Sequence, residues 1–151
     1  MKGDHGDATN CSLPAALEVV GERWSFLILR AAFNGVSHFE KFQSELGIAR
    51  NILAGRLAKL VAHEILQRCD CIDDRRKVTY SLTAKGAALL PVIVALRQWG
   101  ERWEKCSPCN PVLVDRRDCK PVRDVHIIAA DGRSVELSEL RWLDRANLDQ
   151  S

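Results

Sequence analysis

The chain of 151 residues has little net charge and no long apolar run. No apolar stretch approaches the roughly 20 residues that a bilayer-spanning helix needs, and segment 1–10 is polar, unlike a signal peptide. We therefore expect a cytoplasmic protein with no membrane partner. A formal net charge of +2 is too small to indicate nucleic-acid binding by itself, so a DNA-binding surface must be sought in the placement of the basic residues.

Motifs that support enzyme chemistry are also scarce. The sequence shows neither a Gly-rich phosphate loop nor a Ser/His/Asp arrangement. Cys106-x-x-Cys109 has the spacing of a thioredoxin-like dithiol. However, no βαβ pattern precedes it, and it follows a predicted long helix whose negative pole disfavours a thiolate. We predict that the protein is not an enzyme and needs no cofactor.

The composition that is present, 46% hydrophobic and 28% charged, is typical of a globular domain with a buried core. Apolar residues recur at helical spacing in segments 12–21 and 24–34, with Ser12 as the expected N-cap of the first. Residues 37–40 have the pattern of a capping box for a third helix that ends at Gly47. A fourth helix follows at once, and so short a turn requires the two helices to cross steeply.

The fourth predicted helix, within segment 48–62, turns an unusual face away from the core. Its apolar positions are Leu53, Leu57, Leu60 and Val61. The opposite face consists of small or short side chains, namely Asn51, Gly55, Ala58 and Ala62, and the cations on this helix are Arg50, Arg56 and Lys59. Small side chains between cations would let the helix approach a DNA groove closely. The alternative is that this face packs against another helix.

Two β-favouring runs, 65–72 and 77–82, flank a charged tip and predict a hairpin that would form a wing. The basic residues of the tip are Arg75, Arg76 and Lys77. They either contact DNA phosphates or are merely solvated. Thr83 then caps a long helix to about Lys105, kinked at Pro91, whose wide apolar stripe predicts a partner chain as its cover.

The composition changes after this helix. Runs 112–117 and 125–130 favour strands, Asp131-Gly132 predicts a hairpin turn, and Ser138 is placed to cap a short helix. The fold class is therefore mostly α with a small β wing: a winged helix-turn-helix over 1–105, plus a C-terminal β-hairpin appendage and short helix over 106–151.

Several stretches in fixed order resemble the HxlR family of winged helix-turn-helix transcription regulators. The matching stretches are Cys11-Ser12-Leu13-Pro14, Gly21-Glu22-Arg23-Trp24, Ile28-Leu29-Arg30, His38-Phe39-Glu40-Lys41-Phe42, Gly47-Ile48, Leu53-x-x-Arg56-Leu57, Tyr80-Ser81-Leu82-Thr83-x-x-Gly86, Pro91-Val92 and Leu96-x-x-Trp99. One departure is Ala49, which stands where family members often carry a helix-capping serine.

The resemblance implies a homodimer that places the fourth helix in the major groove of each half of a near-palindromic operator in double-stranded DNA. It also implies that the protein is a repressor or dual regulator of a nearby operon. We predict the residues closest to bases to be Arg50, Asn51, Ala54 and Lys59. We predict the contacts to DNA phosphates to be Lys41, Arg56, Arg75, Arg76 and Lys77.

The six cysteines are better explained as free thiols, a redox switch or metal ligands than as the disulfide scaffold of a small secreted protein. Cys11 lies just before the first helix, where the macrodipole stabilises a thiolate, so it is the candidate redox sensor, against a silent thiol. Cys69 and Cys71 are two apart on a predicted strand and therefore point to the same face. There they could be metal ligands, partners of Cys11 in another subunit, or packing residues. A weaker hypothesis is a zinc site, with the ligand set Cys106, Cys109, Cys119 and His126.

Two other functions stay open at this point. The helix-turn-helix scaffold could have lost operator binding and serve as a redox or protein-interaction module, although the basic residues of the fourth helix argue against it. Alternatively, a dimer cavity beneath Trp24, Trp99 and Trp103 could take an aromatic effector, whereas inward-facing tryptophans are more often core. The partners expected are thus DNA, a second copy of the chain, and a small-molecule or oxidant effector.

Overall fold

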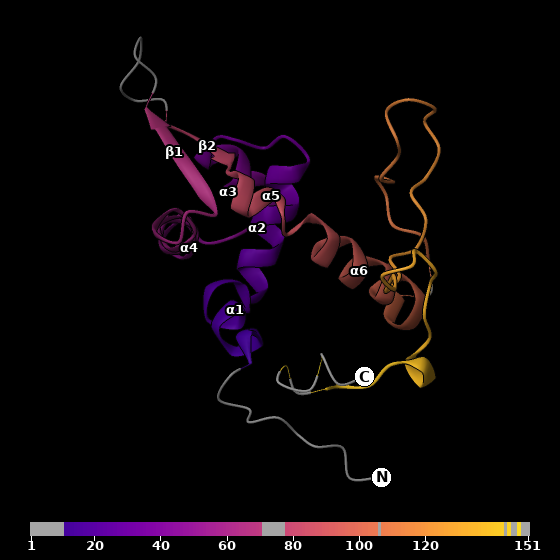
Figure 1. Ribbon diagram of the computed structural model, residues 1–151. Helices are drawn as coiled ribbons and strands as arrows, with labels where there is room; N and C mark the ends of the chain where they lie inside the picture. Colours follow the sequence, from indigo (N-terminus) through magenta and orange to yellow (C-terminus); the bar gives the residue numbers. More distant parts are fainter. Residues whose placement is uncertain (1–10, 71–77, 106, 144, 146–147, 149–151) are drawn as a thin grey trace. The chain divides into compact units, whose positions relative to one another are not determined.

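The computed structural model describes residues 11–70, 78–105, 107–143, 145 and 148 (Figure 1). These residues belong to two compact units, one spanning Ala15–Asn110 and the other combining the residues before it with those from Pro111 onward. The elements in chain order are α1 (Ser12–Val20), α2 (Arg23–Phe33), α3 (Phe39–Leu46), α4 (Arg50–Ala62), β1 (Leu66–Asp70), β2 (Val78–Leu82), α5 (Ala84–Ala87), α6 (Leu90–Gly100), a π-helical turn (Glu101–Lys105) and a 3₁₀ turn (Leu137–Glu139). None of the described helices is long and apolar enough to cross a lipid bilayer.

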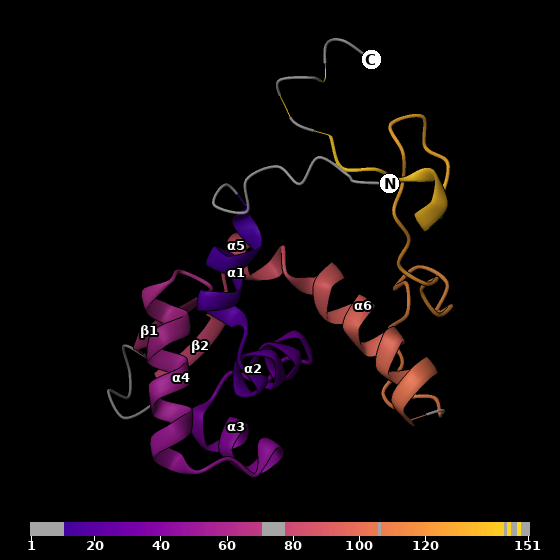
Figure 2. The same ribbon diagram turned by 90° about the horizontal axis from the view of Figure 1, so that it is seen from below.

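The core of the larger unit lies among α2, α3, α4 and the start of β1, and Figure 2 shows α4 running beside the strand pair. Leu53, Leu57 and Leu60 of α4 are at most 1% exposed, which confirms the predicted inward face of this helix. The other core residues are Val20, Ile28, Leu29, Ala31, Val36, Phe42, Ile48, Ile65 and Leu66.

The turn between α3 and α4 is short because Gly47 takes a left-handed conformation, with φ of +62°. Glycine adopts this conformation without the steric cost that a Cβ brings. The Gly47 N–H donates to the Gln43 carbonyl at 3.0 Å and closes α3. Ile48 and Leu53 are then both buried on either side of Ala49, the N-cap of α4, in the arrangement of a hydrophobic staple. These contacts fix the direction in which α4 leaves the turn.

The predicted capping box over residues 37–40 is wrong. Helix α3 begins at Phe39, its N-cap is His38, and no side chain caps it. The Ser37 hydroxyl instead lies 3.1 Å from His38 Nδ1, and the Ser37 carbonyl accepts the Tyr80 N–H at 2.8 Å. An isolated bridge between His38 and Thr79 of β2 holds this segment extended. Tertiary pairing with the wing strand therefore displaces the local cap.

The predicted long helix is broken rather than kinked. Thr83 caps α5 as expected, because its Oγ1 accepts the Gly86 N–H at 3.0 Å. That helix ends at Ala87, and Pro91 lies in the first turn of a new helix, α6. Proline is tolerated in a first turn, where its missing N–H has no helical partner to lose, but not in a helix interior. Helix α1 also differs from its prediction. The sequence predicts Ser12 as the N-cap, outside the helix, whereas α1 begins at Ser12 itself.

The wing is an antiparallel pair in which the register runs from Leu66 opposite Leu82 to Asp70 opposite Val78. Both strands fall inside the predicted runs 65–72 and 77–82, so the hairpin strands are confirmed. The predicted tip, residues 71–77, lies outside the described residues.

The second unit differs from the strand-rich appendage that the sequence predicts. Its described residues form isolated bridges rather than strands, Val114 with Pro121 and Ile128 with Ser134. The predicted turn is present, since Gly132 has φ of +87° and donates its N–H to the Ala129 carbonyl at 2.9 Å. The short helix is a 3₁₀ turn capped by Glu136, not Ser138. None of the described side chains from 111 onward is fully buried, so no local core holds extended runs in register.

Candidate nucleic-acid interface

The outward face of α4 is confirmed as a surface of small side chains. Asn51, Ala54, Gly55 and Ala58 are all exposed, as is Ala62 at the end of the helix. No residue on this face extends further than an asparagine, so the helix backbone is accessible to a flat or concave partner. A major groove accepts an α-helix in this manner.

Two exposed cations lie on the helix-turn-helix, Arg50 at the start of α4 and Lys41 on α3. Arg50 is the first residue of α4, and its guanidinium carbon lies 4.8 Å from the centre of the Phe39 ring. A cation–π contact of this kind limits the rotamers of a long side chain without neutralising its charge. Lys41 is exposed in the first turn of α3. Both cations are accessible to a phosphate.

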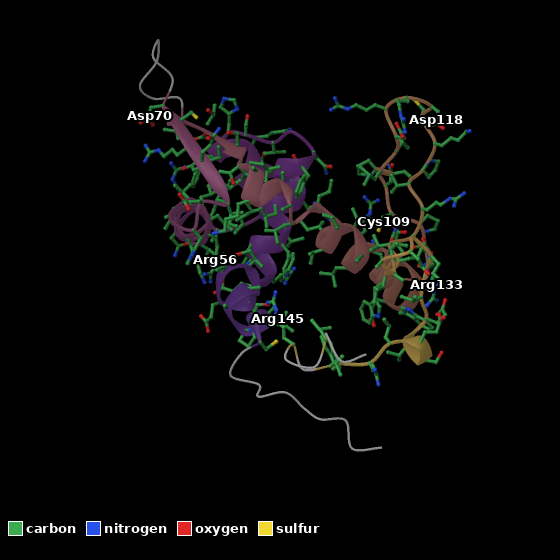
Figure 3. The ribbon with its side chains drawn as sticks, in the orientation of Figure 1. Arg56, Asp70, Cys109, Asp118, Arg133 and Arg145 are labelled. Atoms are coloured by element: carbon green, nitrogen blue, oxygen red, sulfur yellow. The ribbon has the colours of Figure 1, made fainter. Side chains whose placement is uncertain are left out.

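Arg56 and Lys59, which the sequence also assigns to DNA, have an acidic partner. Arg56, labelled in Figure 3, pairs through Nη1 with Oε2 of Glu22. The Lys59 Nζ lies 3.8 Å from Oε1 of the same carboxylate. Glu22 comes directly before α2, so the pairing joins α2 to α4. The three predicted tip residues, Arg75, Arg76 and Lys77, lie outside the described residues.

Sequence reasoning missed Phe39 and Glu22 as parts of this surface. The helical spacing of Phe39 is typical of a core residue, yet the side chain is half-buried and its ring also contacts Arg50. Glu22 was noted only as part of a family motif. Its link to Arg56 joins elements far apart in the chain, and no spacing rule brings such residues together.

A second surface lies on α6 and the π-helical turn that continues it. The predicted stripe divides into half-buried positions, Leu89, Ile93 and Gly100, and positions open to solvent. The exposed large apolar side chains are Val92 (49%), Leu96 (52%), Trp99 (52%) and Trp103 (66%). Large apolar side chains gathered on one helix face are typical of a protein–protein contact. Trp99 and Trp103 thus lie at the surface of the single chain.

The cysteines differ in their surroundings. Cys11, Cys69 and Cys119 are exposed free thiols, whereas Cys109 is half-buried. A hydrogen bond from the Cys109 thiol, together with its backbone N–H, lowers the pKa of the Glu101 carboxyl below its ordinary value. Cys71 and Cys106 lie outside the described residues, and within the described part no three His, Cys, Asp or Glu side chains gather as metal ligands.

The order of elements defines the class of protein. Helices α3 and α4 are joined by a tight glycine turn, and an antiparallel strand pair follows α4 directly. This is the arrangement of a winged helix-turn-helix, in which the second helix of the pair is the recognition helix.

The family model described as HxlR-like helix-turn-helix matches residues 19–108. The chain belongs to this family and is a transcriptional regulator of the helix-turn-helix type.

Three similar proteins indicate how far the likeness extends. The uncharacterized HTH-type transcriptional regulator Rv3095 of Mycobacterium tuberculosis is 38% identical over 117 residues, which cover 78% of this chain and 74% of that protein. The solved structure of the candidate transcription factor PA1607 is 37% identical, with a TM-score of 0.82 over 91% of this chain and 96% of the other. The redox regulator HypR, in its oxidized form, is 29% identical, with a TM-score of 0.57 over 61% of this chain and 96% of the other.

Proposed function

We propose that the protein binds a near-palindromic operator in double-stranded DNA as a homodimer and represses transcription from it. The observation that carries this proposal is the outward face of α4, a row of small exposed side chains that begins beside the exposed cation Arg50. Arg50, Asn51 and Ala54 would lie nearest to the bases, and Lys41 would contact a phosphate. A dimer that occupies DNA beside a promoter excludes polymerase, which gives repression as the expected sign. Because its target is the chromosome, we place the protein in the cytoplasm.

The homodimer is supported by the exposed stripe of α6. Leu96 and Trp99 are each half exposed, and Trp103 more so. A second copy of the same helix, related by a two-fold axis, would cover this stripe with an identical one. Two recognition helices then read two half-sites about one helical turn apart, which matches a palindromic operator.

We further propose that oxidants regulate this DNA binding through Cys11. The thiol is exposed and directly precedes α1. The similarity to HypR, a redox regulator, supports this role. Accessible thiolates are the cysteines that oxidants modify first.

Two substitutions separate phosphate contact from base reading. Lys41→Ala should weaken binding to every duplex by a similar factor and reduce the slope of log K against log salt by about one, as expected when one phosphate contact is lost. Asn51→Ala should leave that slope unchanged but alter the preferred sequence, because asparagine reads an adenine edge. Fluorescence anisotropy with the DNA upstream of the gene and with a random duplex measures both. If Lys41→Ala leaves the slope unchanged, Lys41 is not a phosphate contact.

The redox proposal predicts a response that depends on one thiol. Hydrogen peroxide oxidises a single thiolate to a sulfenic acid and is itself reduced to water, so treating the wild-type protein with it should change its affinity for operator DNA at least several-fold, and a thiol reductant should restore the affinity. Cys11→Ser should abolish the response. Cys119→Ser is the matched control, because Cys119 is also an exposed free thiol, and it should respond as the wild type does. A Cys11→Ser variant that still responds would contradict the assignment.

A further inference from the structure

We propose that Glu22 restrains Arg56 and Lys59 of the recognition helix and thereby suppresses binding to non-specific DNA. This inference rests on the proposed DNA-binding role of α4. It assigns a function to an acidic residue that contacts no base or phosphate itself. Its effect would be on the selectivity of the regulator rather than on its fold.

The first observation is the direction of the Glu22 side chain. Glu22 is the N-cap residue of α2, in an extended conformation, yet its side chain makes no capping hydrogen bond to that helix. The carboxylate is instead directed at α4, where Oε2 pairs with Arg56 and Oε1 lies 3.8 Å from Lys59. Arg56 and Lys59 are three positions apart on a helix, so their side chains are neighbours. One carboxylate therefore holds both cations.

The second observation is the degree of burial. The Arg56, Lys59 and Glu22 side chains are 32%, 31% and 40% exposed, and the Arg56 Nε and Glu22 Oε2 atoms are themselves buried. Salt screens a partly buried pair less than an exposed one. At the same time, about a third of each cation is accessible, so a phosphate can compete for it. By contrast, Arg50 and Lys41 are exposed and form no described ion pair with an acid.

The pairing with Glu22 reduces the affinity that DNA gains from phosphate contacts to α4. Binding to random DNA depends almost entirely on phosphate contacts, each of which releases counterions. A phosphate that engages Arg56 or Lys59 must compete with a carboxylate that already offsets one of their two positive charges, so this contact contributes less than one to a free cation. Contacts between the small face of α4 and base edges do not have this cost. Glu22 would therefore reduce non-specific affinity more than operator affinity.

The test is Glu22→Gln, with affinities measured across a salt series for a random duplex and for the DNA upstream of the gene. We expect the variant to bind the random duplex several-fold more tightly, because two cations are released. Its slope of log K against log salt should be steeper by about one, at about 0.9 per additional phosphate, because one negative charge is removed. The ratio of operator affinity to random affinity should fall. An unchanged slope, or weaker binding to the random duplex, would overturn the proposal.

Two controls isolate the restraint from simple loss of charge. Glu18→Gln removes the same charge from exposed α1, where Glu18 forms no ion pair with another described residue, and its slope should match the wild type. In an Arg56→Gln/Lys59→Gln background, Glu22→Gln should have no further effect on the slope. A merely structural role would lower the unfolding temperature without steepening the slope. If Glu22→Gln does not fold, Glu22→Asp, whose shorter side chain cannot reach both cations, should give an intermediate slope.

Failure of this proposal is distinguishable from failure of the proposed function. If the wild type binds random DNA but shows no preference for any upstream site, the operator proposal fails, and the slope comparison still decides the role of Glu22. If it binds no duplex at any salt, both proposals are overturned. If it binds an operator but the slopes of wild type and Glu22→Gln coincide, only the Glu22 proposal fails.

Discussion

Replacing Leu96 with glutamate should convert the protein from a dimer to a monomer and lower its affinity for operator DNA by roughly a hundredfold or more, because the second half-site is no longer bound intramolecularly. Leu96 is 52% exposed in the single chain, so the glutamate is tolerated in the monomer. In a two-fold dimer the substitution would bring two charges into an apolar contact, where they repel each other and lose their solvation.

Light scattering after size exclusion measures the outcome directly. The wild type should have twice the chain mass of 16.9 kDa, and the Leu96→Glu variant should have that mass once. Leu96→Met keeps the apolar volume and should remain a dimer with unchanged DNA affinity. A Leu96→Glu protein that stays dimeric would show that α6 is not the dimer contact.

Gly86→Ala should destabilise the larger unit by about 3 kcal/mol, at the upper end of the usual cost of overpacking. A Cβ at Gly86 would lie 2.1 Å from the Ile65 carbonyl oxygen, which is a backbone atom, and 3.2 Å from the Leu82 side chain. The Ile65 carbonyl also accepts the Thr83 N–H at 3.2 Å, so it cannot move without disturbing the junction of wing and α5. Urea unfolding measures the loss.

Gly55→Ala is the matched control for this experiment. No atom lies within 4 Å of a Cβ built at Gly55, and the residue is in the interior of α4. Alanine should therefore leave stability unchanged or raise it by up to about 1 kcal/mol, since glycine is the poorer helix former. Equal stabilities of the Gly86→Ala and Gly55→Ala proteins would contradict the close approach at Gly86.

The recognition helix could be predicted because its information is local. Buried Leu53, Leu57 and Leu60 recur at helical spacing, and Gly47 marks the turn before them. The wing strands were predictable for the same reason, since β-favouring runs and a charged tip are neighbours in sequence. Once the inward face of α4 is fixed, its outward face follows from helix geometry alone.

The features that sequence reasoning missed depend on contacts between distant segments. The pattern at Ser37 satisfies a local capping rule, but pairing of His38 with Thr79 in β2 extends the chain there. The Glu22 pair with Arg56 joins α2 to α4 and has no sequence signature. The segments expected to form strands after residue 111 have high β propensity. Such propensity stabilises a strand only when one of its faces packs against other residues. The described side chains of that unit provide no buried face of this kind.

The most direct test of the central claim is to titrate the purified protein against the DNA upstream of its own gene and of the neighbouring genes, over a salt series, with a random duplex as competitor. We predict saturable binding at one upstream site with a stoichiometry of two chains per site, a steep salt dependence and a large preference over the random duplex. Binding that is no tighter to any upstream segment than to random DNA would contradict the assignment of this protein as an operator-binding regulator.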